Sequence, residues 1–204
     1  MVQEYEPVYT ESNAGNLAVV DPNDVRLYSD VLDMNEIPLT VEHLTIGYDS
    51  CNSTSVTRLD LSGYQNLITL EVKPCCFRNV KEVKLIGMER LSRVDIGFSC
   101  FTNHPNEGFY DPNRRFYLKH CPALKLFMLD YFSFSDYSVC EMEDLPSLEV
   151  IEMGRQNTNS SNFQYASLEL RSEWHPRELT SRFAQVDAGH VGGARIQRLH
   201  AGCI

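Results

Sequence analysis

The sequence contains no apolar stretch long enough to cross a bilayer and no sign of a secretory leader. No run approaches the roughly 18–20 consecutive apolar residues that a membrane-spanning helix needs. The first residues, MVQEYEPVYTESNAGNLAVV, have neither the basic start nor the apolar run of a signal peptide. We therefore expect a cytoplasmic protein that does not associate with membranes.

Positive charge is almost absent from the first 43 residues. They hold nine acidic residues and one basic residue, Arg26, so they carry −8 of the net charge of −10. The remaining chain is close to neutral and has no basic stripe. Because such a chain repels phosphate backbones and anionic lipid, its charge argues against nucleic acid and membranes as partners.

Paired cysteines and the common catalytic motifs are also lacking. The seven cysteines are odd in number and none shows C-x-x-C spacing, so we expect no disulfide framework, no metal site and no cofactor. There is no G-x-S-x-G, P-loop or H-E-x-x-H motif, and GHVGGARI at 189–196 lacks the Lys-Ser/Thr end of a phosphate loop. The catalytic alternative is an enzyme, or a regulatory fragment of one, that uses the adjacent His120 and Cys121.

What the sequence does contain is one pattern of apolar positions, written several times. Four anchor leucines are 24, 33 and 24 residues apart, and apolar residues recur at fixed positions before and after each anchor. The wider spacing contains nine extra residues within 102–115. The columns are Leu59, Val83, Phe116 and Cys140; Leu61, Leu85, Leu118 and Met142; Tyr64, Met88, Cys121 and Leu145; Leu67, Leu91, Leu124 and Leu148; Leu70, Val94, Phe127 and Ile151; Val72, Ile96, Leu129 and Met153; and Phe77, Phe101 and Phe134.

Each unit has two pairs of apolar residues two positions apart, which is the period of a short strand. One coil cannot bury its apolar side alone, so stacked coils must share a single interior. The pattern predicts a mainly β or α/β solenoid of about five coils with short strands on both sides. We assign 1–40 to an acidic N-terminal tail and cap, 41–172 to the solenoid, and 173–204 to a degenerate C-terminal cap or disordered tail. A truncation or frame shift after about residue 172 is the alternative, because the repeat begun at Leu168 is not completed.

The pattern Leu67-x-x-Leu70-x-Val72, repeated from the later anchors, resembles the leucine-rich repeat. The 24-residue unit lies within that family's range of about 20–29 residues. The step Cys76-Phe77 and its two equivalents are similar to the irregular, BspA-like type of this family. The resemblance covers about residues 41–172. It implies a non-catalytic scaffold that binds a protein partner of unknown identity, with no small-molecule substrate.

The outward positions of the first strand in each unit form the candidate binding surface. Leu126 and Met128 flank an inward phenylalanine, so we expect both to be exposed, and an exposed apolar patch often marks a protein partner. The alternative is that the insert at 102–115 covers the patch with Phe109 and Tyr110. The insert is itself a second candidate binding loop. The candidate partner-binding residues are Leu126, Met128, Asp130, Tyr131, Arg93, Asp95, Glu71, Val150 and Glu152.

Overall fold

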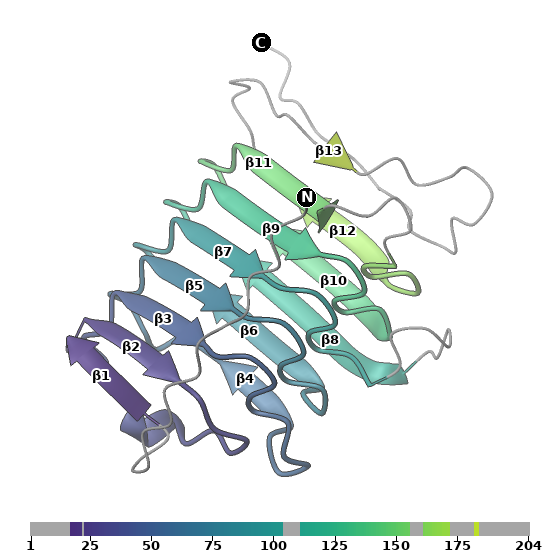
Figure 1. The fold of residues 1–204 in the computed structure, drawn as a ribbon. Helices are drawn as coiled ribbons and strands as arrows, with labels where there is room; N and C mark the ends of the chain where they lie inside the picture. The colour runs from purple at the N-terminus through teal and green to yellow at the C-terminus, as the bar shows by residue number, and fades with distance from the viewer. Residues whose placement is uncertain (1–16, 22, 104–110, 156–160, 172–181, 184–204) are drawn as a thin grey trace, which may run out of the picture.

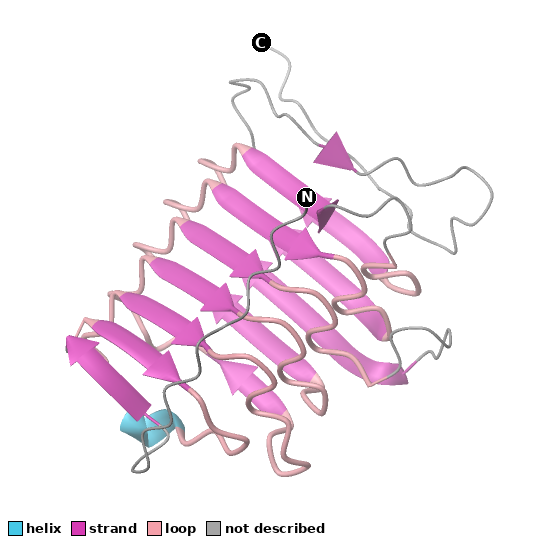
Figure 2. Cartoon of the chain, viewed as in Figure 1, coloured by secondary structure: helices cyan, strands magenta, loops and turns pink. Residues whose placement is uncertain are grey.

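The computed structural model is built from short, mainly parallel strands in two sheets, and Figure 2 shows almost no helix among the residues described. It describes residues 17–21, 23–103, 111–155, 161–171 and 182–183 (Figure 1). The eight-stranded sheet has the order β1 (Leu17–Asp21), β2 (Asp24–Leu27), β3 (His43–Ile46), β5 (Thr69–Val72), β7 (Arg93–Ile96), β9 (Leu126–Asp130), β11 (Val150–Arg155) and β13 (Arg182–Phe183). The five-stranded sheet has the order β12 (Ser167–Arg171), β10 (Tyr137–Glu143), β8 (Asp111–Lys119), β6 (Glu82–Ile86) and β4 (Arg58–Asp60).

From β3 onward, consecutive strands alternate between the two sheets, so neighbours within a sheet are one repeat apart in sequence (Figure 1). These neighbours are parallel and in register. Leu70 lies opposite Leu44 and Val94, and in the other sheet Val83 lies opposite Leu59 and Phe116. The predicted columns therefore do stand side by side, and the structure is compatible with the mainly β or α/β class expected from the sequence.

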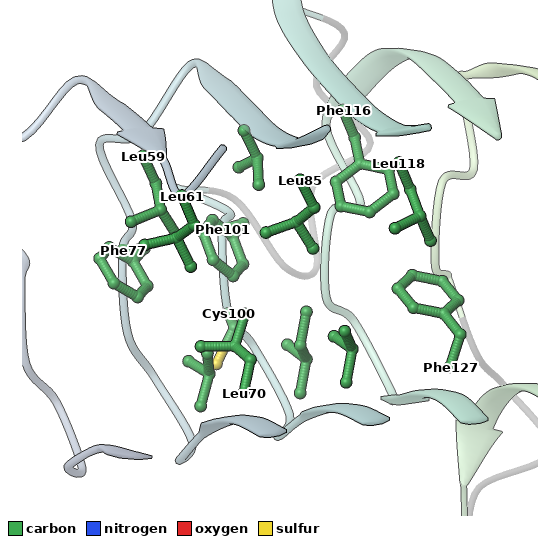
Figure 3. Packing of buried hydrophobic residues seen from close by; sticks show 14 of the residues in the cluster. Leu59, Leu61, Leu70, Phe77, Leu85, Cys100, Phe101, Phe116, Leu118 and Phe127 are labelled. Carbon is green, nitrogen blue, oxygen red and sulfur yellow. The ribbon is translucent and has the colours of Figure 1, made fainter. Parts of the chain in front are cut away.

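The interior between the sheets is a continuous apolar core, part of which is drawn in Figure 3. A ladder of phenylalanines runs along it. Phe101 stacks on Phe77 with ring centroids 4.8 Å apart and on Phe134 at 4.6 Å, and Phe134 stacks on Phe163 at 4.8 Å. Each ring belongs to a different repeat, so the ladder ties successive turns together through offset ring contacts.

The turns after β5, β7 and β9 are each held by a small polar side chain that reaches the preceding repeat. The thiol of Cys76 donates to the carbonyl of Gly47 (2.8 Å), and that of Cys100 to the carbonyl of Lys73 (3.1 Å). The hydroxyl of Ser133 makes the equivalent bond to the carbonyl of Gly97 (2.6 Å). Two positive-φ residues recur in these turns, at Cys75 and Phe77 and at their equivalents. Cys76 and Cys100 therefore have a structural role in these turns.

The N-terminal end of the core is covered by residues that follow β2. The short 3-10 helix η1 (Met34–Glu36) lies there, and the hydroxyl of Tyr64 donates to the Met34 carbonyl at 2.7 Å. Leu32 and Met34 pack against the core. The strand β2 itself lies parallel to β3 and buries Val25 and Leu27, so it extends the sheet as well as the cap. The proposed tails at 1–16, 172–181 and 184–204 lie outside the described residues.

Gly97→Ala is expected to destabilise the fold. A Cβ at Gly97 would lie 2.7 Å from both the backbone nitrogen and the Cδ of Pro74, which cannot move aside without shifting the turn. We expect a loss of about 1–3 kcal/mol in the free energy of unfolding, measured by urea denaturation. Gly63→Ala is the control, because nothing lies within 4 Å of its Cβ, and its effect should stay within about 0.5 kcal/mol. Equal effects at the two positions would contradict this packing.

Candidate functional site

The candidate binding residues lie on the outer face of the eight-stranded sheet, which we call the outer A face. The burial alternates along β5 and β7, so that Glu71, Arg93 and Asp95 point away from the core. Two rows cross the strands in register. One runs from Arg93 to Leu126 and Val150, and the other runs from Glu71 through Asp95 and Met128 to Glu152. The structure therefore brings together residues that are up to 81 positions apart (from Glu71 to Glu152).

Met128 does not have the exposure that the sequence predicted. Its side chain is only 7% exposed, although it lies outside the core cluster, while Leu126 is half-buried. Strand alternation fixes the face to which a side chain points, but not how far its surroundings cover it. Met128 lies on a central strand, flanked in register by Asp95 and Glu152. The outward apolar pair on this face is therefore Leu126 and Val150, both half-buried, which lie directly opposite one another.

Two like charges face each other across neighbouring strands on the outer A face. Glu71 and Asp95 lie directly opposite across β5 and β7, a placement that is unfavourable for two like charges. Their cations lie along the same strands, since Lys73 pairs with Glu71, and Arg93 with Asp95 at 2.8 Å. The repulsion between Glu71 and Asp95 is thus reduced by the cation that pairs with each of them from its own strand.

On the outer face of the five-stranded sheet, which we call the outer B face, Glu141 lies opposite Glu169, while two other cross-strand pairs carry opposite charges. Arg58 lies opposite Glu82 and pairs with it at 3.1 Å. Lys119 lies opposite Glu143 and pairs with it at 3.4 Å, and it reaches Glu141 at 2.6 Å. In those two pairs, opposite charges face each other across the strands, which is what stability alone favours.

An aromatic stack borders the outer A face at the ends of its strands. Phe98 and Tyr131 follow β7 and β9, and their rings stack at 5.2 Å with an interplanar angle of 4°. Both are half-buried, so part of each side chain remains accessible. Tyr131 is thus placed beside the rows of charged and apolar residues, as the sequence predicted, while the contribution of Phe98 was missed.

The catalytic alternative finds little support in the geometry of His120 and Cys121. The Cys121 thiol is fully buried and donates to the Lys119 carbonyl at 3.3 Å. Burial raises the pKa of this thiol to about 11, so the thiolate that a nucleophile needs is disfavoured. His120 is exposed, and its Nδ1 lies 3.1 Å from a carboxylate oxygen of Asp144.

A buried charged cluster at the base of the insert was not identified from the sequence. Arg114 and Asp136 are each 2% exposed, and Nε of Arg114 lies 3.4 Å from Oδ2 of Asp136. The backbone N–H of Asn103 donates to the same carboxylate oxygen at 3.2 Å, and Asp111 approaches the guanidinium at 3.6 Å. Both stems of the insert are therefore tied to one ion pair. The available signal was strand alternation, because Arg114 stands two positions before the inward Phe116.

Phe109 and Tyr110 lie within residues 104–110, outside the described residues, so whether they cover the patch of Leu126 and Met128 stays a prediction. In the part of the chain that is described, no cluster of His, Cys, Asp and Glu is arranged to hold a metal ion. Within the same ranges there is also no helix with the length and apolar character to span a bilayer. Comparison with protein-family models, curated proteins and solved structures gave no significant match to this chain.

Proposed function

We propose that this chain is a leucine-rich-repeat-like solenoid that acts as a non-catalytic scaffold and binds another protein through the outer A face. The repeat columns and the parallel register of both sheets support the solenoid. The candidate residues come from four neighbouring strands of a regularly spaced array, β5, β7, β9 and β11, which is a suitable platform for binding an extended surface.

The observation that carries the proposal is the set of charged and apolar side chains that the strand register gathers in two rows on the outer A face. This face sets Glu71 opposite Asp95 and places the half-buried apolar pair of Leu126 and Val150 alongside. Two like charges directly opposite one another cost stability in the free protein. A partner that contacts this face would offset that cost.

The proposal is tested by charge insertion on matched faces. Leu126→Asp with Val150→Asp should abolish capture of partner proteins from cell lysate, because an aspartate pair would be desolvated in the interface. Ile86→Asp with Val139→Asp is the control, since these residues are also half-buried and apolar but point outward from the five-stranded sheet. Quantitative mass spectrometry of the captured proteins is the measurement. Two results would rule out the outer A face as the binding surface. One is loss of the same proteins with both double variants, and the other is capture that neither double variant changes.

The catalytic alternative has its own test, the reactivity of the thiols. Because Cys121 is buried and its pKa is raised to about 11, we expect it to resist alkylation in the native protein and to react only on unfolding. The half-buried Cys75 should react sooner. Residue-resolved mass spectrometry after brief exposure to iodoacetamide measures the alkylation of both cysteines. Rapid native alkylation of Cys121 would favour the enzyme and contradict the scaffold.

A further inference from the structure

We propose that Cys76 and Cys100 are an oxidation-sensitive pair, which hydrogen peroxide converts into a disulfide that joins two consecutive turns of the array. The pair lies in the turns after β5 and β7, so this role is independent of the partner proposed for the outer A face. It would be a second role for two thiols that also hold these turns through hydrogen bonds.

The two cysteines stand in equivalent positions of consecutive repeats. The strands before them, β5 and β7, are parallel and in register, and the Phe101 N–H donates to the Cys76 carbonyl at 2.9 Å. The two backbones are therefore one strand spacing apart, about 4.8 Å. This spacing lies inside the range of roughly 4.4–6.8 Å that separates the Cα atoms of a disulfide.

The two side chains also point the same way. Each thiol donates to a carbonyl of the preceding repeat, that of Gly47 for Cys76 (2.8 Å) and that of Lys73 for Cys100 (3.1 Å). Both cysteines belong to the apolar core, where Figure 3 shows Cys100. The two Sγ atoms therefore occupy matching places on neighbouring turns, and rotation about the side-chain bonds is enough to bring them together.

The surroundings of the pair favour Cys76 as the thiol that reacts with the oxidant. The backbone N–H of Ser50 donates to its Sγ at 3.4 Å, which stabilises negative charge on that sulfur. A hydrogen bond from the Cys100 thiol lowers the pKa of Cys76, whereas burial raises the pKa of Cys100 well above its ordinary value. A thiolate beside a neutral thiol is the arrangement of a reactive cysteine and its resolving partner.

The reaction has two steps and moves two electrons from the thiols to the peroxide. The Cys76 thiolate attacks one oxygen of hydrogen peroxide and the O–O bond breaks, which leaves the sulfenic acid of Cys76 and a hydroxide that is protonated to water. The sulfur of Cys100 then attacks the sulfur of the sulfenic acid and the S–O bond breaks. The hydroxyl group leaves with the Cys100 proton as a second water, and a thiol reductant reverses the change.

Burial limits the size of the oxidant. Neither Cys76 nor Cys100 has an exposed surface (0% each), so bulky disulfides and alkylating agents cannot reach these sulfurs in the folded protein. Hydrogen peroxide is only about the size of two water molecules and enters when the turns open locally. Cys75 is half-buried and next in the chain, so it is the competing thiol that the experiment must remove.

The test uses the full chain with Cys75 and Cys203 replaced by serine, exposed to a moderate excess of hydrogen peroxide under native conditions. We expect the intact protein to lose about 2 Da, because one disulfide forms with the loss of two hydrogens. Peptide mapping should find Cys76 linked to Cys100. Treatment with dithiothreitol should restore the original mass and both free thiols.

Serine variants of the pair separate the two roles. Serine already occupies the neighbouring positions of this column, at Ser50 and Ser133, so Cys76→Ser and Cys100→Ser should fold. With Cys100→Ser the reactive thiol has no resolving partner, so Cys76 should be oxidised further to the sulfinic acid, a gain of about 32 Da. With Cys76→Ser we expect Cys100 to stay reduced. Thermal denaturation of each variant establishes that it is folded.

Three results would overturn the proposal. The first is that peroxide forms no link between Cys76 and Cys100. The second is a link through Cys51, Cys121 or Cys140 in its place. The third is equal oxidation of Cys76 and Cys100 in the two single variants, which would show that neither thiol is the reactive one.

Discussion

Arg114→Met is expected to lower the free energy of unfolding by about 3–5 kcal/mol, the usual cost of breaking a buried ion pair. Its guanidinium donates to the carbonyls of Arg78 (2.8 Å), Phe101 (3.2 Å) and Val80 (3.3 Å). All three acceptors would lose a partner, and the Asp136 carboxylate would lose its counter-charge. Equilibrium urea denaturation gives the difference.

The loss in free energy of unfolding caused by Arg114→Met, which we call the deficit, should also depend on pH. Burial raises the pKa of Asp136 in the folded protein, in spite of the opposing effect of Arg114. A carboxyl with a raised folded pKa binds more protons folded than unfolded, so its contribution to stability is greatest below the unfolded pKa and falls as pH rises through the folded one. Without Arg114 the pKa of Asp136 rises further, so this fall continues to higher pH. The deficit should therefore be smaller near about pH 4–5 than at about pH 7.

Arg115→Met is the matched control for this prediction. Arg115 is the next residue on β8 and is exposed on the outer B face, so its replacement should change stability by less than about 0.5 kcal/mol at either pH. If Arg114→Met and Arg115→Met behaved alike, or if the deficit grew on acidification, the buried ion pair would not have the role given to it.

Phe101→Ala is expected to cost about 3–5 kcal/mol, because a large core side chain would be replaced by a cavity. Phe101 is 1% exposed and lies between two rings of the ladder, so two ring contacts are lost in addition to its buried area. The backbone φ at this position is 56°, which alanine must also adopt, so the change adds no new backbone strain.

Phe98→Ala, three residues earlier, is the control for the phenylalanine ladder. Phe98 is half-buried and stacks on Tyr131 at the border of the outer A face. We expect its loss to cost about 1 kcal/mol, measured by the same denaturation experiment. A cost for Phe98→Ala equal to that for Phe101→Ala would contradict the distinction between ladder and border.

The repeat columns made much of the fold predictable, because each apolar position in one unit must meet its equivalent in the next. The alternating strands, the shared core and the phenylalanine ladder all follow from that requirement. The bonds from Cys76 and Ser133 to carbonyls of the preceding repeat did not follow, because a small polar residue in a turn has several possible acceptors.

The candidate site was only partly predictable. The direction of Leu126 and Val150 follows from alternation, while the burial of Met128 depends on its surroundings and could not be read from its own strand. Arg114 shows the reverse case. Alternation with Phe116 indicates an inward side chain, but charge suggested an exposed one, and the partner that permits burial, Asp136, is 22 residues away.

The central claim is that successive repeats stack in register. The most direct test is to measure the distance between pairs of spin labels by double electron–electron resonance. Arg26, Thr45 and Glu152 point outward in one row that crosses β2, β3, β5, β7, β9 and β11. With Cys75 and Cys203 replaced by serine, labels at Arg26→Cys and Glu152→Cys should be about 24 Å apart, five strand spacings. Labels at Thr45→Cys and Glu152→Cys should be about 19 Å apart, four spacings. Two distances that do not differ by about one strand spacing, or that both exceed roughly 35 Å, would contradict the stacked array.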